Sequence, residues 1–396
     1  MSNTQKKNVP ELRFPGFEGE YSLDIFGNLA TNKSDKFNPQ NENASIDIEL
    51  DCIEQNMGRL IKIYNSKEFS SQKNKFNPQN VLYGKLRPYL NKYYFTKKSG
   101  VCSSEIWVLK STKEDKLLNL FLYYFIQTKR YSDVASKSAG SKMPRADWGL
   151  IENIRVYFPE LCEQQKIGEF FSKLDRQIEL EEQKLELLQQ QKKGYMQKIF
   201  SQELRFKDEN GNDYPEWVVK LIGDIGKVAM NKRIYKHETS ANEEIPFYKI
   251  GNFGKKADTF ISREQFNEYK EKYPYPKKGD ILISASGSIG KTIEYKGEEA
   301  YYQDSNIVWL DHNEEVLNVF LKYFYILVKW NGVEGTTIKR LYNKNILNTK
   351  IDLPTISEQQ KIGDFFCYID NLIEIQEQKL EFLKRRKQSL LQKMFV

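Results

Sequence analysis

The sequence has few of the residues from which catalytic and metal sites are usually built. It contains only two histidines, His237 and His312, and four cysteines that occur singly, without a C-x-x-C pair. A zinc site or a Ser-His-Asp arrangement needs more than this. We interpret the cysteines as buried structural thiols, and we expect no metal site and no catalytic residues in this chain.

Long apolar runs are missing as well. No stretch approaches the ~20 apolar residues of a membrane span, and the opening MSNTQKKNVPELRFPGF lacks the hydrophobic core of a signal peptide. We therefore expect a cytoplasmic protein. The 396 residues are 29% charged and 39% hydrophobic, with 24 Tyr and 24 Phe, a composition typical of a chain that folds into two or three domains.

What the chain does contain is an internal repeat. Residues 163–200 and 358–395 align without a gap at an offset of 195, and 21 of their 38 positions are identical. Shorter matches lie upstream: FLYYF (121–125) with FLKYF (320–324), and ELRF at 11–14 and again at 203–206. The chain is therefore a tandem duplication whose two halves diverge in their middles.

The repeated segment predicts a long helix in each half. Apolar residues recur at the a and d positions of a heptad, and the frame continues to Tyr195 and Leu390. Two matching seams most simply pack on each other over ~57 Å, although a second surface is left for a partner helix. Polar residues interrupt the seams at equivalent places: Glu181 and Lys192, then Gln376 and Lys387. The predicted packing residues are Phe171, Leu174, Ile178, Leu185 and Leu188, with Phe366, Ile369, Ile373, Leu380 and Leu383.

The divergent middles are typical of mixed α/β domains. Short β-rich runs alternate with turn formers, as in VLYG, EIWVL, DILIS, TIEYK and NIVWL, and short helices are predicted at 114–130 and 313–330. We predict an α+β fold with two mixed α/β domains joined by two long antiparallel coiled-coil helices, an internal tandem repeat with pseudo-two-fold symmetry. The predicted boundaries are 1–160 and 203–354 for the two domains, and 161–202 and 355–396 for the two spacer helices.

Positive charge is concentrated in the two middles. Residues 31–155 hold 21 Lys and Arg against 13 Asp and Glu, and residues 231–350 hold 19 against 16. Residues 156–200 hold 7 against 8. Two basic regions joined by a near-neutral one suit a polyanion contacted at two places, with lysine-rich solubility as the alternative. Because the middles differ, they would read two unrelated half-sites on a DNA partner.

Several motifs together resemble a known family. They are the duplicated P-x-x-x-E-Q-Q-K-I-G helix starts (159–168 and 354–363), GDILISASGSIGK (279–291) and the G-x-x-x-x-R segments (140–145 and 335–340). Over essentially its whole length, the chain resembles the specificity subunits of type I restriction–modification systems.

The resemblance implies a function and a set of partners. Each middle would be a target recognition domain, the helices would be spacers, and the chain would read a two-part asymmetric DNA site with a fixed gap. It would have no catalytic activity of its own. It would bind double-stranded DNA, two methyltransferase (modification) subunits and, through them, the restriction (translocase–nuclease) subunits. The chain would bind no cofactor itself, with S-adenosylmethionine, ATP and Mg²⁺ on the partner subunits.

Basic, aromatic and small polar residues in turns are the candidate DNA contacts. In the first middle, a basic and aromatic turn follows a predicted strand, and such residues suit phosphate and base contacts. Arginine before the last strand of each middle can bind guanine or a phosphate. Solvated loops and structural salt bridges are the alternatives. The candidates are Lys85, Arg87, Tyr89, Lys142, Arg145, Asn32 and Lys33, then Ser286, Ser288, Lys291, Lys339, Arg340, Asn231, Lys232 and Arg233.

The stretch ISASGSIGKT (283–292) is close to a phosphate-binding loop, but Ala285 stands where that motif has its first glycine. The following TIEYKG alternates like a strand, whereas a phosphate loop continues into a helix. We predict a tight turn between two strands. Two other functions stay open at this point: a self-sufficient DNA enzyme with a remnant nucleotide site, and a coiled-coil adaptor that binds no nucleic acid.

Overall fold

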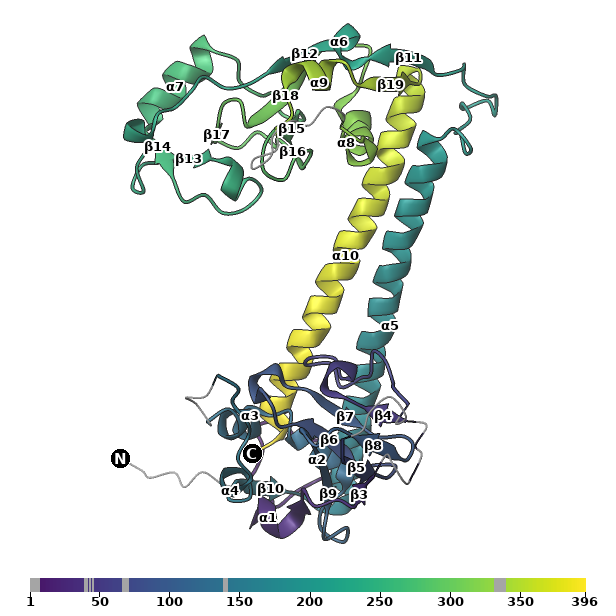
Figure 1. Cartoon of the computed structure of the whole chain (residues 1–396), viewed down its shortest axis with the longest axis vertical. Helices are drawn as coiled ribbons and strands as arrows, with labels where there is room; N and C mark the ends of the chain where they lie inside the picture. The colour runs from purple at the N-terminus through teal and green to yellow at the C-terminus, as the bar shows by residue number, and fades with distance from the viewer. Residues whose placement is uncertain are drawn as a thin grey trace. The chain divides into compact units, whose positions relative to one another are not determined.

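The computed structural model describes residues 8–38, 42, 44, 46–65, 71–137, 142–330 and 340–396. The chain divides into two compact units: unit 1 is Met1–Gln183 with Glu377–Val396, and unit 2 is Lys184–Gln376. The long helices α5 (Leu161–Phe200) and α10 (Ile356–Met394) each contribute to both units (Figure 1). Among the described residues, no helix combines the length and apolar character needed to span a bilayer.

Unit 1 contains two four-stranded sheets and one strand pair. Its strand pair is antiparallel: β1 (Ser22–Ile25) with β10 (Arg155–Phe158). One sheet has the order β2 (Ala30–Thr31), β9 (Ile106–Ser111), β6 (Val81–Gly84), β7 (Tyr93–Phe95). The other has the order β3 (Lys36–Phe37), β5 (Lys73–Phe76), β8 (Gly100–Cys102), β4 (Asp47–Ile48). Within the described part of unit 1 the short helices are α1 (Phe26–Leu29), η1 (Leu50–Cys52), η3 (Pro88–Leu90), α2 (Asn119–Phe125), α3 (Lys129–Ala135) and α4 (Trp148–Ile151).

Unit 2 is built on a related plan. Here β11 (Val218–Leu221) pairs with β19 (Lys350–Leu353). The four-stranded sheet has the order β12 (Gly226–Ala229), β18 (Ile307–His312), β15 (Ile281–Ser284), β16 (Thr292–Glu294). A three-stranded sheet has the order β14 (Phe260–Ile261), β13 (Ile245–Tyr248), β17 (Tyr301–Tyr302). The helices are α6 (Ile222–Ile225), η4 (Lys236–Glu238), η5 (Ile250–Asn252), α7 (Arg263–Lys272), α8 (Asn318–Leu327) and α9 (Asn343–Leu347).

These elements confirm the predicted α+β fold with a tandem repeat and long helices. The five predicted strands correspond to β6, β9, β15, β16 and β18. The helix predictions were less accurate, because 114–130 contains α2 and only the start of α3, and 313–330 contains the shorter α8. Helix α7 was not predicted: its sequence REQFNEYKEK buries only Phe266 and shows little apolar periodicity.

Each unit has a mixed α/β part, residues 8–158 in unit 1 and 203–353 in unit 2, which we call its head. The repeated EQQ motif joins the head of each unit to its long helix. In unit 1 the carboxylate of Glu163 is fully buried, and it accepts hydrogen bonds from Arg13 Nε (2.8 Å), Arg13 Nη2 (2.7 Å) and the Tyr21 hydroxyl (3.1 Å). In unit 2 the equivalent groups are Glu358, Arg205 and Trp217. The repeats ELRF and EQQ are therefore the two sides of one buried ion pair.

The glutamine that follows each buried glutamate, Gln164 or Gln359, binds the loop that precedes α2 in unit 1 or α8 in unit 2. Gln164 accepts from the backbone N–H of Leu118 (2.9 Å) and donates to the carbonyls of Lys116 and Pro159. Gln359 makes the same three contacts in unit 2, with Leu317, Glu315 and Pro354. Because buried backbone groups need partners, both glutamines hold a head loop against the first turn of a long helix.

The glycine of the EQQKIG motif allows a close helix contact in each unit. A Cβ atom on Gly363 would lie 2.5 Å from both γ-methyl carbons of Val319, a β-branched side chain with little rotamer freedom. We expect Gly363→Ala to lower the free energy of unfolding by ~1–2 kcal/mol, because overpacking outweighs the gain in helix propensity. Gly194→Ala is the matched control: a Cβ there meets nothing within 4 Å, so we expect a gain of ~0.5–1 kcal/mol. Thermal unfolding should therefore shift in opposite directions for the two variants, and shifts of the same sign would contradict this packing.

The predicted packing residues of the long helices are buried or half-buried. Phe171, Leu174, Ile178, Phe366, Ile369, Leu380 and Leu383 are buried, and Leu185, Leu188 and Ile373 are half-buried. Tyr195 does not follow the predicted frame: it is 40% exposed, and its neighbour Met196 is 5% exposed. Leu391 is likewise buried in preference to Leu390. A straight α-helix drifts ~20° per heptad relative to a 3.5-residue repeat, which moves the seam by one residue.

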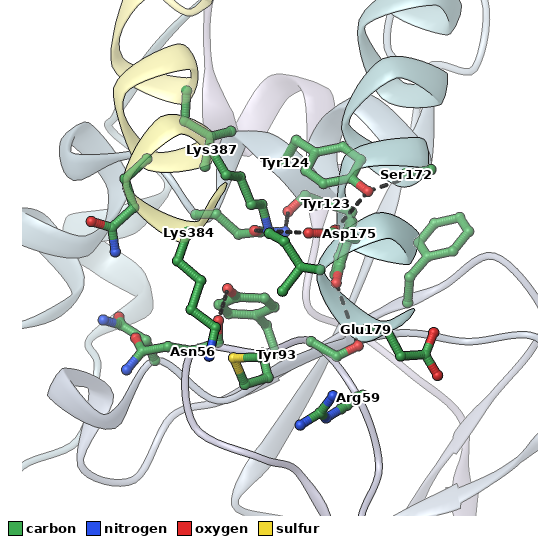
Figure 2. A pocket seen from close by; sticks show the side chains of 18 of the residues that line it. Asn56, Arg59, Tyr93, Tyr123, Tyr124, Ser172, Asp175, Glu179, Lys384 and Lys387 are labelled. Carbon is green, nitrogen blue, oxygen red and sulfur yellow. Dashed lines mark hydrogen bonds and ion pairs between the residues drawn. The ribbon is translucent and has the colours of Figure 1, made fainter. Parts of the chain in front are cut away.

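The two lysines that interrupt the seams, Lys192 and Lys387, form ion pairs between the antiparallel helices. In unit 1, Lys387 on α10 lies 2.6 Å from Asp175 on α5, and Asp175 also accepts from the Tyr124 hydroxyl at 3.0 Å (Figure 2). In unit 2, Lys192 on α5 pairs with Asp370 on α10, which accepts from Tyr323 at 2.7 Å. Each pair links both long helices to one head. We infer that these pairs set the helix register, because a shift would leave a charge unpaired.

Candidate nucleic-acid interface

In unit 1 five of the seven predicted DNA contacts come together on two paired segments, residues 85–89 and 142–146, which we call the loop pair of unit 1. A β-bridge joins Leu86 to Arg145. The backbone N–H of Ala146 donates to the Lys85 carbonyl (2.8 Å), and that of Arg87 donates to the Pro144 carbonyl (2.7 Å). Two groups of candidates that are about 60 residues apart in the sequence therefore share one surface.

The loop pair of unit 1 presents positive charge and one aromatic ring. Arg87 and Lys142 are exposed, and the side chain of Tyr89 is 54% exposed. Arg145 forms two hydrogen bonds with Glu105, from Nε (2.9 Å) and Nη2 (3.1 Å), and these hydrogen bonds hold the pKa of Glu105 below its ordinary value. Exposed cations beside an exposed ring suit contacts to phosphates and to base edges.

Unit 2 has the same backbone arrangement with different side chains. Its loop pair consists of residues 285–291 and 340–342. A β-bridge joins Ser286 to Arg340, and the N–H of Leu341 donates to the Ala285 carbonyl (2.8 Å). Ser288 is exposed, but Ser286 is buried and donates to Asn306 Oδ1 at 2.7 Å. Lys339 lies outside the described residues.

The glycine-rich stretch is a turn between two strands, as predicted. Strand β15 ends at Ser284 and β16 begins at Thr292, and Gly287 and Gly290 have positive φ angles of 66° and 78°. The ammonium group of Lys291 donates to the Phe253 carbonyl at 2.6 Å, so an internal contact already holds it. A phosphate loop would need a helix after the turn, and a strand stands there.

The candidates at the start of each middle are more varied. Lys33 is exposed and Asn32 is half-buried. In unit 2, the Lys232 ammonium lies 5.0 Å from the centre of the Tyr273 ring, and Arg233 lies 3.5 Å from Asp304. Asn231 is 3% exposed, so its side chain is buried in unit 2.

Two residues that contact the loop pairs were missed by the sequence reasoning, Glu105 and Asn306. Each precedes the central strand of its sheet, β9 or β18, and each contacts a residue of its loop pair. The signal that would have found them is the match of SEIWVL with SNIVWL, which places the two residues at the same point of the repeat.

Unit 1 also has a cavity of about 790 Å³, lined by residues of β7, α2, α5 and α10 (Figure 2). Charged residues on its walls pair with one another: Lys387 with Asp175, and Lys384 with Glu182 at 2.6 Å. Arg59 also pairs with Glu182. Among the residues that the structure describes, no cluster of three or more His, Cys, Asp or Glu side chains is placed to hold a metal ion.

A comparison with protein families identifies the repeat. The model of the type I restriction modification DNA specificity domain matches residues 20–190 and again residues 214–385. The chain belongs to the type I restriction modification DNA specificity family. Each match contains one loop pair, so the two specificity domains carry the same frame with different side chains.

Relatives of this specificity family are found in bacteria and archaea. The chain is 42% identical over 261 residues to a putative type I restriction enzyme specificity subunit of Haemophilus influenzae, and the alignment spans 63% of each protein. It is 27% identical over 321 residues to the MjaVIII specificity subunit of Methanocaldococcus jannaschii, across 75% of this chain and 74% of that one.

Two solved structures share the fold. The S subunit of the type I restriction–modification system of M. genitalium aligns with a TM-score of 0.57 and 17% identity, over 98% of this chain and 99% of that one. A chain from a structure of type I R-M complex assembly and conformational transition aligns with a TM-score of 0.60 and 17% identity, over 94% and 97% of the two chains.

Proposed function

We propose that this chain is the DNA-recognition subunit of a type I restriction–modification complex. Each specificity domain reads one half of a two-part asymmetric DNA site with a fixed gap, and the loop pair of each unit is the part that contacts DNA. The chain is non-catalytic and acts in the cytoplasm. S-adenosylmethionine, ATP and Mg²⁺ are bound by the partner subunits, which carry out methylation, ATP hydrolysis and cleavage.

The observation that carries this proposal is the pair of equivalent bridges, Leu86 to Arg145 and Ser286 to Arg340. A conserved backbone frame holds the two loop pairs in the same local conformation, so the differences between them are differences of side chain. The loop pair of unit 1 carries Lys85, Arg87, Lys142 and Arg145, whereas that of unit 2 carries Lys291, Arg340 and two serines, of which Ser286 is buried. Two surfaces with the same backbone bridge but different side chains suit the recognition of two different half-sites.

Exposed apolar side chains on the long helices support docking of the methyltransferase subunits. In unit 1, Leu180 and Phe382 are exposed, and in unit 2, Leu187, Tyr368 and Ile375 are exposed. The last two lie seven residues apart on α10, so they share a helix face. Large exposed apolar residues in a row are typical of a protein-binding surface.

The proposal is tested by co-expressing the chain with its methyltransferase subunit and mapping methylated sites by sequencing. We expect a two-part motif with a fixed gap that appears only when both proteins are present. Methylation without this chain, or ATP turnover or methylation by the purified chain alone, would contradict the proposal. The adaptor alternative would hold if the complex bound no duplex at low salt.

Docking gives a separate prediction. We expect the double variant Tyr368→Glu with Ile375→Glu to bind the methyltransferase subunit at least ~10-fold more weakly, because two exposed apolar anchors become charged. The fold should be unchanged, since both side chains are more than 60% exposed. Val219→Glu, another exposed apolar position in unit 2, is the control and should bind normally. Calorimetric titration measures both, and equal affinities would exclude this face as the docking surface.

A further inference from the structure

Arg145 in the loop pair of unit 1 is held by a carboxylate that lies 40 residues earlier in the chain. Its Nε donates to one oxygen of Glu105 (2.9 Å) and its Nη2 donates to the other (3.1 Å), so the long side of the guanidinium is used. The Arg145 side chain remains 48% exposed and that of Glu105 is 27% exposed. The pair therefore lies at the surface of the loop pair.

This geometry leaves the end of the guanidinium free. Within the described residues, no hydrogen bond is formed by Nη1 of Arg145, and Nη2 uses only one of its two hydrogens. Three N–H groups remain. Two of them, one on Nη1 and one on Nη2, are parallel at the end of the guanidinium and have the spacing that arginine uses for the O6 and N7 atoms of guanine in the major groove. A carboxylate on the long side and a guanine at the end do not compete for the same donors.

We propose that Glu105 is a specificity-determining residue, which orients Arg145 so that the end of its guanidinium reads a guanine in the half-site of unit 1. This inference rests on the proposed function. Glu105 makes no contact with the base itself. It acts by restricting the rotamers of Arg145 before DNA binds, so less side-chain freedom is lost on binding.

The surroundings of Glu105 favour this role. The backbone N–H of Lys85 donates to the Glu105 carbonyl (3.0 Å), and the positive charge of Lys85 adds to that of Arg145 in lowering the pKa of the Glu105 carboxyl group. The carboxylate thus stays ionised between two cations. Because the bridge from Leu86 to Arg145 fixes the backbone as well, both ends of the Arg145 side chain are positioned.

Unit 2 differs at this position. Asn306 takes the place of Glu105, and its Oδ1 is occupied by the Ser286 hydroxyl at 2.7 Å. The Arg340 side chain donates one long hydrogen bond, from Nη2 to the Ser305 carbonyl at 3.4 Å, and its guanidinium lies 6.0 Å from the centre of the Tyr342 ring. No carboxylate of the described residues pairs with Arg340. An arginine oriented by a carboxylate is therefore found in the loop pair of unit 1 and not in that of unit 2. A change at Glu105 should affect only the half-site that unit 1 reads.

The test uses the complex of the full chain with its methyltransferase subunit, which selects duplexes from a randomised library. We expect Glu105→Ala and Arg145→Lys to weaken the preference for the same single guanine, by roughly 10- to 100-fold. The other half-site should be unchanged. Affinity for non-specific duplex should stay the same or rise in Glu105→Ala, because a negative charge is removed beside the phosphates.

Controls separate this role from a structural one. Glu105→Gln keeps the shape and one acceptor, so it should fold normally and lose part of the guanine preference. Glu244→Gln removes the carboxylate of another exposed pair, with Arg263 Nε at 2.6 Å, and should change no base preference. Unchanged guanine preference in Glu105→Ala overturns the inference. Increased preference overturns it too, since Glu105 would then mask Arg145. If the wild-type complex selects no sequence, the proposed function fails as well.

Discussion

Replacing Glu163 by alanine should lower the free energy of unfolding of unit 1 by about 3–5 kcal/mol. The Glu163 side chain is fully buried, and that of Arg13 is 14% exposed. Removing one partner of such a pair leaves the other charge buried without compensation, which costs far more than the pair contributes when intact. The Tyr21 hydroxyl also loses its acceptor. Urea denaturation, combined with hydrogen exchange in β1 and the first turns of α5, measures the loss.

Two variants calibrate this result. Glu169→Ala removes an exposed glutamate from the same helix and should change stability by less than ~0.5 kcal/mol. Glu358→Ala removes the equivalent carboxylate of unit 2, where Arg205 and Trp217 donate to it, and should weaken unit 2 by a similar amount. A loss below ~1 kcal/mol in both glutamate variants would show that this ion pair is not what holds the heads to the helices.

Lengthening both long helices by one heptad should lengthen the gap of the methylated site by about three base pairs, with both half-sites kept. The change duplicates residues 180–186 in α5 and the facing residues 376–382 in α10, as set by the Asp175–Lys387 and Lys192–Asp370 register. Seven residues add ~10.5 Å of helix, and one base pair adds 3.4 Å of duplex. The duplicated heptads preserve the apolar seam, so the Lys387–Asp175 and Lys192–Asp370 pairs should still form.

Lengthening only α5 is the matched control. The added turns of α5 then have no facing seam on α10, so we expect loss of methylation and a less stable chain. Sequencing of methylated sites gives the gap directly. If the gap stayed the same while distance measurements between labelled heads showed that they had moved apart, the helices would not set the gap.

The sequence was sufficient to predict the elements that depend on local patterns. Residues near one another in the chain predict the heptads of the long helices, the strands around VLYG and DILIS, and the turn at the glycine-rich stretch. The a and d frame failed near Tyr195 and near Leu390, because the drift of a straight helix accumulates with length.

Contacts between distant residues were not predictable. Arg145 and Glu105 meet because residues 85–86 contact both segments: a β-bridge joins Leu86 to Arg145, and the Lys85 N–H donates to the Glu105 carbonyl. No pattern in either segment shows this. In the sequence Lys387 only interrupts the apolar seam. Its partner Asp175 becomes apparent when the antiparallel register of the two helices is known. The burial of Asn231 is also a tertiary effect, since its polar neighbours suggest an exposed loop. Which of the fifteen candidate residues contact DNA stays a prediction.

The central claim is that the two specificity domains read the two halves of the target independently. The most direct measurement is the methylation pattern of a chain in which residues 203–354 are replaced by a second copy of residues 8–159, with both long helices unchanged. We predict a site made of two copies of one half-site, with the sequence read by unit 2 lost. A methylated site that still contained the half-site assigned to unit 2 would show that the two domains do not read their half-sites independently.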